Sequence, residues 1–444
     1  MPVHTTMEER IEIMERSKEG KPAWRISRDL RWSQQTVRKW RKRGHEQGRS
    51  GLVSHMGRPK RGALSSFPTE IRETIIRWRT EHPGWGEDTL CAELKQQSCF
   101  ADQKLPSTAS IGRFLQEQGF PKPREKHTQL PNSDRQPTGA PHQVWEMDAR
   151  GYQYIPDVGM VSLINLNDRF SHTRLLSYPC QLGEKVVIRH ANTADYQVAL
   201  RLAFTHWGFP VSLQVDHESV FYDNKTKSPF PTMLHLWLCA LGIRLTFSRV
   251  HRPTDQAITE RTHQLWAGQV LDGQCFSDWQ ILYDALQNRR DFLNYHLPCA
   301  SLQRQPPLHA NPHALHSGQI YRPEWEADLL DLQRVYEYLA QGKWFRRVSA
   351  SGTFSLGANV YYVGAAWQRH QLEIRFDAKA QQFLCHDESG HLIKQIAWKD
   401  DLLKSLLGHA MPPFDLPAFQ LHLPFSWDEM RAQHFLYRTR DTTL

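Results

Sequence analysis

The chain has 444 residues, too many for one ordinary hydrophobic core, so we expect about three or four folded units. Hydrophobic residues make up 40% of it and charged residues 23%, a balance that excludes intrinsic disorder. The formal net charge of +8 indicates a polyanionic partner, although bulk charge alone leaves DNA, RNA and a membrane surface open.

Cysteine usage and hydropathy indicate the compartment. The seven cysteines are scattered and none forms a C-x-x-C pair, so neither a disulfide framework nor a zinc ribbon is indicated. No run approaches about 18 consecutive apolar residues, and the start of the chain lacks an apolar run behind basic residues. We therefore expect a cytoplasmic protein that does not interact with a membrane.

Three short helices are predicted at the start of the chain, because apolar residues recur there at helical spacing. They cover residues 7–18, 22–30 and 34–43. Ser33 is a natural N-cap for the third helix. The pattern of helix, helix, turn and helix predicts a helix-turn-helix DNA-binding domain with a basic linker over residues 1–62. A plain three-helix bundle is the alternative interpretation.

Basic residues concentrate around this third helix. Between residues 31 and 61 there are ten Lys or Arg residues and one acid, Glu46. Amides and cations on such a helix can reach base edges and phosphates in the major groove, and the basic stretch at 57–62 suits a minor-groove arm. A solvated basic face and a flexible linker are the alternatives. The predicted DNA-contacting residues are Gln34, Gln35, Arg38, Lys39, Arg41, Lys42, Arg43, Arg58, Lys60 and Arg61.

A second helical set follows, with helical patterns over residues 69–81, 87–97 and 107–118. It predicts a second helical DNA-binding domain over residues 63–120, with a scaffold that only packs as the alternative. Residues 121–142 contain five prolines among polar residues, which is typical of an extended linker.

Beyond the linker, strand-like and helical runs alternate. The strand-like runs are residues 144–152, 158–166, 173–179, 211–215 and 243–247, and the helical runs are residues 184–207, 232–241, 255–271 and 278–295. The order is three strands, helix, strand, helix, strand, helix. This is the order of an RNase-H-like sheet, so we expect an RNase-H-like α/β core over residues 143–300.

Four segments of this core combine an acidic residue with neighbours that form a recognisable sequence motif. They are residues 145–148 (WEMD), 166–171 (LNDRFS), 215–221 (VDHESVF) and 248–261 (SRVHRPTDQAITER). These segments resemble the integrase-core transposases of bacterial insertion sequences, relatives of the retroviral integrases with a DDE, RNase-H-like catalytic core. The resemblance extends over roughly residues 7–400.

The resemblance implies a DDE-type DNA transposase or integrase, which is a polynucleotidyl transferase with Asp148, Asp216 and Glu260 as its catalytic and metal-binding residues. It implies two Mg²⁺ or Mn²⁺ ions, with Asp148 bridging both. Such a pair can activate a nucleophilic oxygen, stabilise a leaving oxygen and neutralise charge at phosphorus, and carboxylates suit these ions. Arg252 and Arg261 flank the glutamate and are expected to contact phosphate, with a solvated role as the alternative.

The resemblance also implies the reaction and the partners. The reaction is metal-dependent 3′-end cleavage and strand transfer of mobile-element DNA. The partners are double-stranded DNA, as element ends and as target, and further copies of this chain in a homo-oligomer on DNA. An accessory ATPase is a candidate partner, and the expected location is the bacterial nucleoid.

Two turns depart from the family's pattern. His217-Glu218 stands where the family usually has asparagine-glycine, and so does Asp255-Gln256 before the glutamate helix. Residues 222–231 form an insertion that lengthens the spacing from Asp216 to Glu260. Loops tolerate such insertions, so the assignment of the acids is unaffected.

Three further polar residues lie near the predicted site. Asp168 is predicted to be a structural acid at the edge of a strand. Glu146 is two residues before Asp148 and shares its strand face, but we expect it to be solvated. His263 lies one helical turn beyond Glu260, and we expect a hydrogen-bonded structural histidine.

The rear of the chain changes in composition. Residues 301–344 are predicted to form a connector with a helix over residues 325–341. Short strand patterns at 359–363, 371–377, 382–384 and 391–398 predict a small antiparallel, SH3-like β-barrel over residues 345–402, similar to the C-terminal barrel of the integrase family. Residues 403–444 are expected to be a C-terminal tail, to which we assign no function.

The predicted fold class is therefore multidomain α+β, with N-terminal helix-turn-helix units, an RNase-H-like α/β catalytic core and a C-terminal small β-barrel. Two other functions stay open. One is a DNA-binding regulator derived from a transposase that has lost catalysis. The other is a metal-dependent nuclease of the same fold, which would cleave DNA without joining it.

Overall fold

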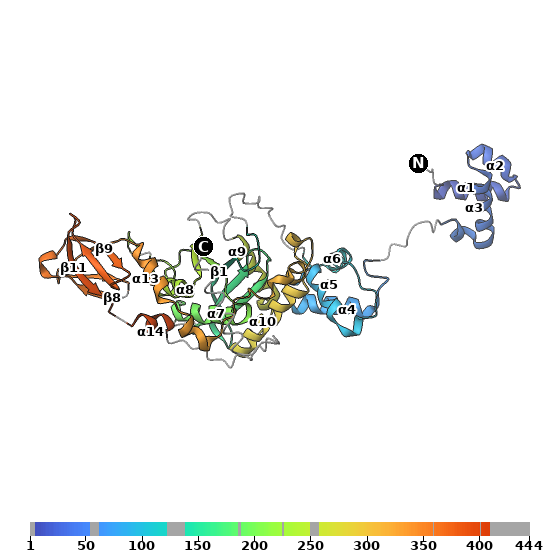
Figure 1. Ribbon diagram of the computed structural model, residues 1–444. Coiled ribbons are helices and arrows are strands. Elements are labelled where there is room, and N and C mark those ends of the chain that lie inside the picture. Colours follow the sequence, from blue (N-terminus) through green and yellow to red (C-terminus); the bar gives the residue numbers. More distant parts are fainter. Residues whose placement is uncertain are drawn as a thin grey trace. The chain divides into compact units, whose positions relative to one another are not determined.

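The computed structural model describes residues 5–53, 62–121, 138–184, 188–223, 226–248, 257–357, 359–399 and 401–408. The chain divides into two compact units, one of Met1–Pro68 with Arg113–Phe120 and the other of Thr69–Gly112 with Pro121–Leu444. Figure 1 labels the elements of both. Among the helices that are described, none is long and apolar enough to cross a membrane.

The first unit begins with a helix-turn-helix, as predicted. Its elements are α1 Met7–Lys18, α2 Ala23–Leu30, α3 Gln34–Gln47 and the 3-10 turn η1 Gly48–Leu52. Thr6 caps α1 in a capping box with Glu9, and Ser33 caps α3 by accepting a hydrogen bond from the Thr36 amide at 3.1 Å. The apolar faces of the helices meet in a small core that consists of Ile13, Ile26, Val37, Trp40 and Leu52.

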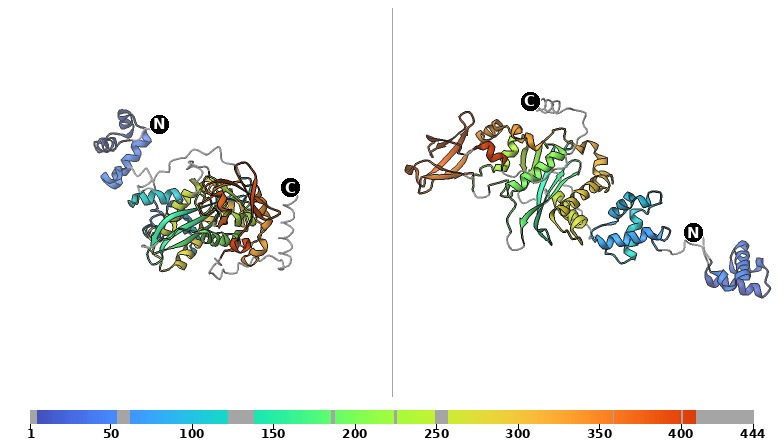
Figure 2. Two further views of the ribbon diagram at one scale, coloured as in Figure 1. Left: turned by 90° about the vertical axis from the view of Figure 1, so that its left-hand side faces the viewer. Right: turned by 90° about the horizontal axis from the view of Figure 1, so that it is seen from below.

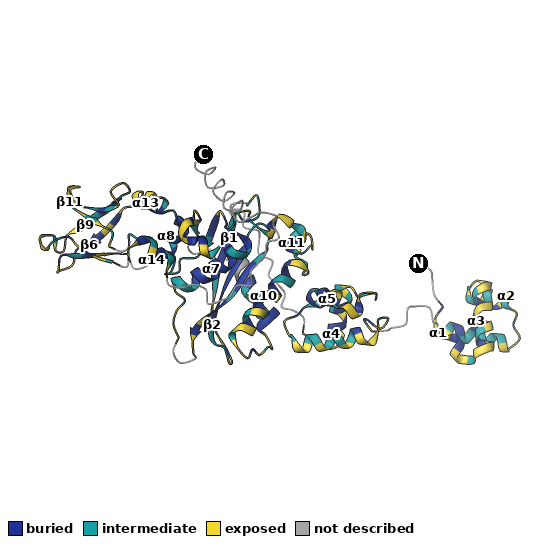
Figure 3. Cartoon of the chain, turned by 60° about the horizontal axis from the view of Figure 1, so that its bottom comes forward, coloured by how far each residue is buried: buried dark blue, intermediate teal, exposed yellow. Residues whose placement is uncertain are grey.

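Three more helices follow, within one or two residues of their predicted ends. They are α4 Thr69–Glu81, α5 Glu87–Gln96 and α6 Thr108–Glu117, with the 3-10 turn η2 Ser98–Phe100 between the last two. The boundary between the two units falls inside α6, so α4 and α5 belong to the second unit. Both helices bury an apolar side and turn more polar sides toward solvent (Figure 3).

The second unit contains a five-stranded mixed sheet. Its strands are β1 Val144–Ile155, β2 Gly159–Asp168, β3 Arg174–Gly183, β4 Ser212–Val215 and β5 Arg244–Phe247. Their order across the sheet is β3-β2-β1-β4-β5; β1, β2 and β3 pair antiparallel, while β4 is parallel to both β1 and β5. The predicted RNase-H-like order is therefore confirmed, and the long ribbon of β1 to β3 can be followed in Figure 2.

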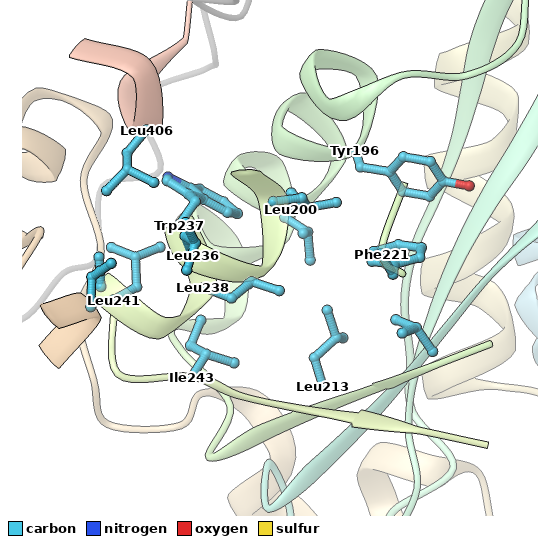
Figure 4. Close-up of a cluster of buried hydrophobic side chains, with 14 of the residues drawn as sticks. Tyr196, Leu200, Leu213, Phe221, Leu236, Trp237, Leu238, Leu241, Ile243 and Leu406 are labelled. Carbon is cyan, nitrogen blue, oxygen red and sulfur yellow. The ribbon is translucent and has the colours of Figure 1, made fainter. Parts of the chain in front are cut away.

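Helices cover both faces of this sheet. They are α7 Thr193–Trp207, α8 Met233–Ala240, α9 Ala257–Trp266, the π-helical turn η4 Ala267–Leu271 and α10 Trp279–Tyr295. Trp145 and Met147 of β1 join α7 and α8 in the largest hydrophobic cluster, part of which Figure 4 shows. Ile155 of β1 joins Trp266 and Leu282 in a second cluster. Since side chains alternate along a strand, Asp148 faces away from the first cluster.

The hairpin of β1 and β2 contains a bulge. Residues Arg150 and Gln153 of β1 pair with Leu163 and Val161 of β2, so β1 has one residue more than its partner at this point. Beyond the bulge Ile155 is buried, whereas Tyr154 is exposed.

The helix predicted over residues 184–207 starts later than expected. β3 runs to Gly183, which has a positive φ of 111° and forms an isolated bridge with Ile188. The helix begins after Asn192, whose side chain accepts hydrogen bonds from the amides of Ala194 and Asp195. Polar strand residues and a true N-cap therefore override the helical pattern before Asn192.

The connector contains short helices: η5 Ala300–Leu302, α11 Pro307–Ala310, η6 Pro312–Leu315, η7 Pro323–Trp325, α12 Glu326–Leu329 and α13 Leu332–Ala340. The single helix predicted over residues 325–341 is wrong, because the chain leaves the helical conformation at Leu330 and Asp331 caps a new helix. Glu326 anchors α12 through a buried ion pair with Arg201 at 2.6 Å.

The C-terminal strands form two separate sheets. The strands are β6 Trp344–Arg347, β7 Thr353–Leu356, β8 Asn359–Tyr362, β9 Gln371–Asp377, β10 Gln382–His386 and β11 Leu392–Ala397, with the turn η8 Ala365–Trp367 and the helix α14 Leu402–Leu407. One sheet has the order β11-β10-β9-β6, and the other is the hairpin β7-β8.

The expected closed barrel is therefore not present among the described residues. Closure would need backbone ladders between the two sheets, but side chains bridge them instead. Lys394 of β11 donates to the carbonyl of Tyr362 in β8 at 3.0 Å, and Arg346 of β6 donates to the carbonyl of Ser355 in β7 at 3.0 Å.

Candidate functional site

Two of the predicted catalytic acids lie side by side on neighbouring strands. Asp148 is on β1, and Asp216 directly follows β4. The two strands are parallel and pair Glu146 with Gln214, so the positions two residues further along face each other across the strands. Asp148, Asp216 and Glu218 each offer a carboxylate oxygen, and these oxygens lie within 4.8 Å of one another.

Glu218 is a residue of this cluster that the sequence analysis missed. Its backbone amide donates to Asp216 Oδ1 at 3.0 Å, and its Oε2 accepts a hydrogen bond from the Tyr196 hydroxyl at 2.6 Å. Tyr196 comes from α7 and packs edge-on against Phe221 at 4.9 Å between ring centroids. Its hydroxyl points away from the hydrophobic cluster (Figure 4). The available signal was an acid two residues after Asp216.

The protonation preferences of the cluster follow from its burial. Burial raises the pKa of Asp216, although the Glu218 amide and His217 oppose this effect. Burial also raises the pKa of Glu218, which the Tyr196 hydroxyl partly offsets. The pKa of Tyr196 is raised by burial and by Glu218, so it stays a neutral donor. A divalent cation would stabilise the ionised carboxylates, and an all-oxygen donor set fits Mg²⁺ or Mn²⁺.

The third predicted acid, Glu260, is in α9, but its side chain lies outside the described part of the structure, as does that of Arg261. The α9 backbone lies against β1 and β2. His263, three residues later, has its Nε2 3.7 Å from Asp148 Oδ2, so His263 lies at the site rather than in a remote structural position. Residues three apart share a helix face. Residue 260 thus lies one turn before His263 on α9, and its role as the third acid stays a prediction.

Glu146 is not solvated, contrary to our expectation. It is 3% exposed, and Arg169 Nε donates to its Oε1 at 2.7 Å, while Arg169 also donates to Gln214. The prediction was wrong because this partner is distant in sequence and compensates the burial of the charge. Asp168 is structural as predicted: its oxygens accept hydrogen bonds from the His142 amide and from Ser171.

The predicted DNA-contacting side chains of α3 lie on its solvent-facing side. Arg43 is half-buried, with its guanidinium 5.4 Å from the centroid of the Trp40 ring. The exposed residues are Gln34, Gln35, Arg38, Lys39, Arg41 and Lys42. Val37 and Trp40 on the opposite side are buried, so core packing orients the polar side outward. The other predicted contacts Arg58, Lys60, Arg61 and Arg252 lie outside the described residues.

Two models of a homeodomain-like domain match the front of the chain. One covers residues 4–53, which include α1 to α3, and the other covers residues 36–115, from α3 into α6. This front end is similar to homeodomain-like domains. The match agrees with the helix-turn-helix geometry and with the exposed polar side of α3.

Solved retroviral integrases are similar to this chain at low identity. The HTLV-2 integrase catalytic core domain, in its trimeric form with magnesium, is 12% identical, with 39% of this chain and 98% of that chain covered and a TM-score of 0.29. The BIV integrase catalytic core domain is 14% identical, covering 39% and 95%, with a TM-score of 0.27. A simian T-cell lymphotropic virus intasome is 13% identical, covering 73% and 96%, with a TM-score of 0.31. The strand order, rather than these scores, defines the fold of the core.

Proposed function

We propose that this chain is a DNA transposase or integrase that cleaves the 3′ ends of a mobile DNA element and joins them to target DNA. The observation that carries the proposal is the carboxylate cluster between β1 and the end of β4, where oxygens of Asp148, Asp216 and Glu218 lie within 4.8 Å of one another. Oxygens gathered in this way match the ligand preference of Mg²⁺ and Mn²⁺.

In this proposal, Asp148, Asp216 and Glu260 hold two divalent cations. When bound, these cations would supply activation of the attacking oxygen and neutralisation of charge at the phosphate. The chain's own residues fix the carboxylates: strand pairing sets Asp148 beside Asp216, and the Glu218 amide orients the Asp216 carboxylate. Glu260 would complete the site from α9, on which His263, three residues later, lies 3.7 Å from Asp148.

DNA binding is assigned to a separate part of the chain. The exposed amides and cations of α3 suit contacts with base edges and phosphates, so they would recognise the element ends. Processing of two ends and their insertion into a target need two active sites held together. We therefore propose that the protein works as a homo-oligomer on DNA.

The variant Asp148→Asn tests the enzymatic assignment. It keeps the shape of the side chain but removes the charge that a divalent cation needs, so we expect Mg²⁺- or Mn²⁺-dependent joining of end DNA to fall by about 100-fold or more. Binding of end DNA through α3 should be unchanged. The measurement is a strand-transfer assay with labelled end DNA, accompanied by a binding assay on the same duplex.

Asp157→Asn is the matched control, because Asp157 is exposed in the β1–β2 turn and has a positive φ of 62°, which Asn adopts readily. Wild-type protein that binds end DNA without any metal-dependent reaction would contradict the proposal and favour the inactive regulator. Cleavage without joining would contradict it in favour of a nuclease.

A further inference from the structure

The helix that carries Glu260 continues into the π-helical turn η4, and this turn contacts the α4–α5 segment. Thr69–Gly112 belongs to the same compact unit as the core. Gly84, between α4 and α5, lies with its backbone against that of Gly268 in η4: a Cβ added at Gly84 would stand 2.2 Å from the Gly268 carbonyl oxygen. Two backbones approach this closely only where no side chain separates them.

Side chains extend the contact on both sides of these glycines. Trp85 Nε1 donates to the carbonyl of Gln269 at 3.2 Å, and the side-chain amide of Gln269 donates to Thr89 Oγ1 at 3.1 Å. His82 stacks on Trp85 with 3.9 Å between ring centroids. Both the backbone and the side chain of Gln269 are therefore bound by the α4–α5 segment.

Arg289 of α10 lies at the centre of this contact and is only 8% exposed. Its Nε donates to Gln269 Oε1 at 3.0 Å, its guanidinium pairs with Glu93 of α5, and its Cζ lies 4.3 Å from the centroid of the Trp85 ring. A buried charge is tolerated only with partners of this quality. The planar guanidinium thus connects α5, η4 and α10 at one point.

We propose that Arg289 is a positioning residue for the catalytic site, and that the α4–α5 segment holds the Glu260 helix in place against Asp148. The inference rests on the proposed function, because that function gives the helix its catalytic role. α9 passes directly into η4, so restraining Gln269 restrains the rotation and rise of the preceding turns. His263 in those turns contacts Asp148. Single π-helical turns are frequent at functional sites, in agreement with this role.

The first test compares two glycines of one loop. Gly84→Ala adds a methyl group where the Gly268 backbone stands, whereas Gly86→Ala adds one where no atom lies within 4 Å. Neither glycine has a positive φ, so neither substitution forces alanine into a left-handed backbone. Gly86 is the N-cap of α5, so Gly86→Ala also reports the effect of alanine at that cap without a new contact to η4. We expect Gly84→Ala to speed hydrogen–deuterium exchange over residues 257–271 and to lower strand transfer by about 100-fold. End-DNA binding should be unchanged, and Gly86→Ala should match the wild type.

The second test changes the cation and leaves the glycines intact. Arg289→Lys keeps a positive charge near Glu93 but loses the planar group that holds Gln269. Arg304→Lys is its control, because Arg304 also pairs with α5, at 2.5 Å to Asp88, but these side chains are 56% and 40% exposed. We expect Arg289→Lys to lower turnover and to raise the Mg²⁺ concentration needed for half-maximal joining, and Arg304→Lys to change neither.

The outcomes separate this inference from the proposed function. Two results would overturn the inference. One is full activity in Gly84→Ala or Arg289→Lys although hydrogen–deuterium exchange in α9 is faster, and the other is a loss of activity while exchange in α9 is unchanged. If Gly84→Ala does not fold, Arg289→Lys decides between these results. Should the wild type join no DNA, the proposed function fails, while exchange over residues 257–271 still shows whether the α4–α5 segment restrains the helix.

Discussion

Glu218 stands where the resembling family has a small residue, and its neighbours explain how the chain accommodates a third carboxylate there. Tyr196 is 1% exposed, yet its hydroxyl reaches Glu218 Oε2 at 2.6 Å. The hydrogen bond offsets part of the cost of burying the charge beside Asp216. It also fixes the Glu218 carboxylate, which limits the positions that its oxygens can take around a cation.

Tyr196→Phe should therefore weaken metal use without removing the carboxylates. A hydrogen bond to a charged group contributes about 1.5–3 kcal/mol, so we expect roughly a tenfold or larger rise in the Mg²⁺ concentration for half-maximal strand transfer. A magnesium titration of the joining reaction measures it. Tyr178→Phe on β3 is the control, since its ring packs against Trp279 and Tyr283 instead. An unchanged magnesium requirement in Tyr196→Phe would argue against a role of Glu218 in the site.

The sequence predicts only those residues of the candidate site that lie in a local motif. Asp148 lies within one predicted strand and Asp216 directly follows another, and a sequence displays both patterns directly. The place of Glu218 depends on Tyr196, 22 residues earlier, and on the pairing of β1 with β4. The burial of Glu146 depends on Arg169, 23 residues later. Contacts of this kind leave no periodic signal in the sequence.

At the scale of elements, long helices and regularly alternating strands can be predicted from the sequence. Short elements, and elements whose ends are set by tertiary contacts, cannot. The patterns give α1, α4 and β9 their observed ends, because each has a full apolar period over its whole length. β6 and β7 are missed, since four residues with a mixed composition hold too little alternation. The open C-terminal sheets differ from the expected barrel through side-chain bridges that follow from tertiary structure.

The insertion after Asp216 also has a structural role that the sequence conceals. Phe230 is buried against Trp344 of β6, with 4.8 Å between ring centroids, and Arg346 of the same strand donates to the carbonyl of Ser228 at 2.7 Å. The segment that follows Asp216 is therefore anchored in the C-terminal strands rather than free at the surface.

The packing of α7 predicts how stability depends on pH. Burial, together with Arg290 and His316, lowers the pKa of His206 to about 3. In the unfolded chain its pKa is about 6.5, so below that pH the unfolded state binds a proton that the folded state excludes. The neutral His206 therefore makes its full contribution to the free energy of unfolding above about pH 6.5. Because the unfolded chain takes up the proton first, that contribution is lost as the pH falls from about 6.5 toward about 3.

We expect His206→Gln to lose about 2 kcal/mol less stability than the wild type between pH 7 and pH 5. Urea unfolding at the two pH values measures the difference. His391→Gln is the control, because the His391 side chain is 82% exposed. Equal losses in wild type and His206→Gln would mean that the imidazole is not held neutral by the fold.

At the scale of the whole molecule, the proposed DNA-contacting residues and the proposed metal-binding acids lie in different compact units. The exposed cations of α3 belong to the first compact unit, and the carboxylate cluster belongs to the second. This division lets the salt dependence of DNA binding be changed without touching the acids, because each phosphate contact releases counterions independently of any reaction.

Replacing Arg41 and Lys42 by Ala should reduce the slope of log affinity against log salt by about 0.9 for each phosphate contact that is lost. Affinity should fall for all DNA sequences alike. Fluorescence anisotropy of labelled end DNA over a series of salt concentrations measures the slope. Arg28→Ala is the control, with an exposed cation on α2 rather than α3. An unaltered slope in the Arg41 and Lys42 variant would place the phosphate contacts elsewhere.

The extra residue in β1 has a consequence for how this hairpin can change length. Between Arg150 and the turn, the bulge decides that Ile155 rather than Tyr154 enters the interior. Deleting Gly151 would remove the extra residue and restore a regular ladder, so Ile155 would keep its partner on β2 and stay inside. Deleting a second residue from the same stretch would shift the alternation by one and turn Tyr154 inward and Ile155 outward. A shortening of β1 by one residue at the bulge should therefore be tolerated, whereas a shortening by two should not.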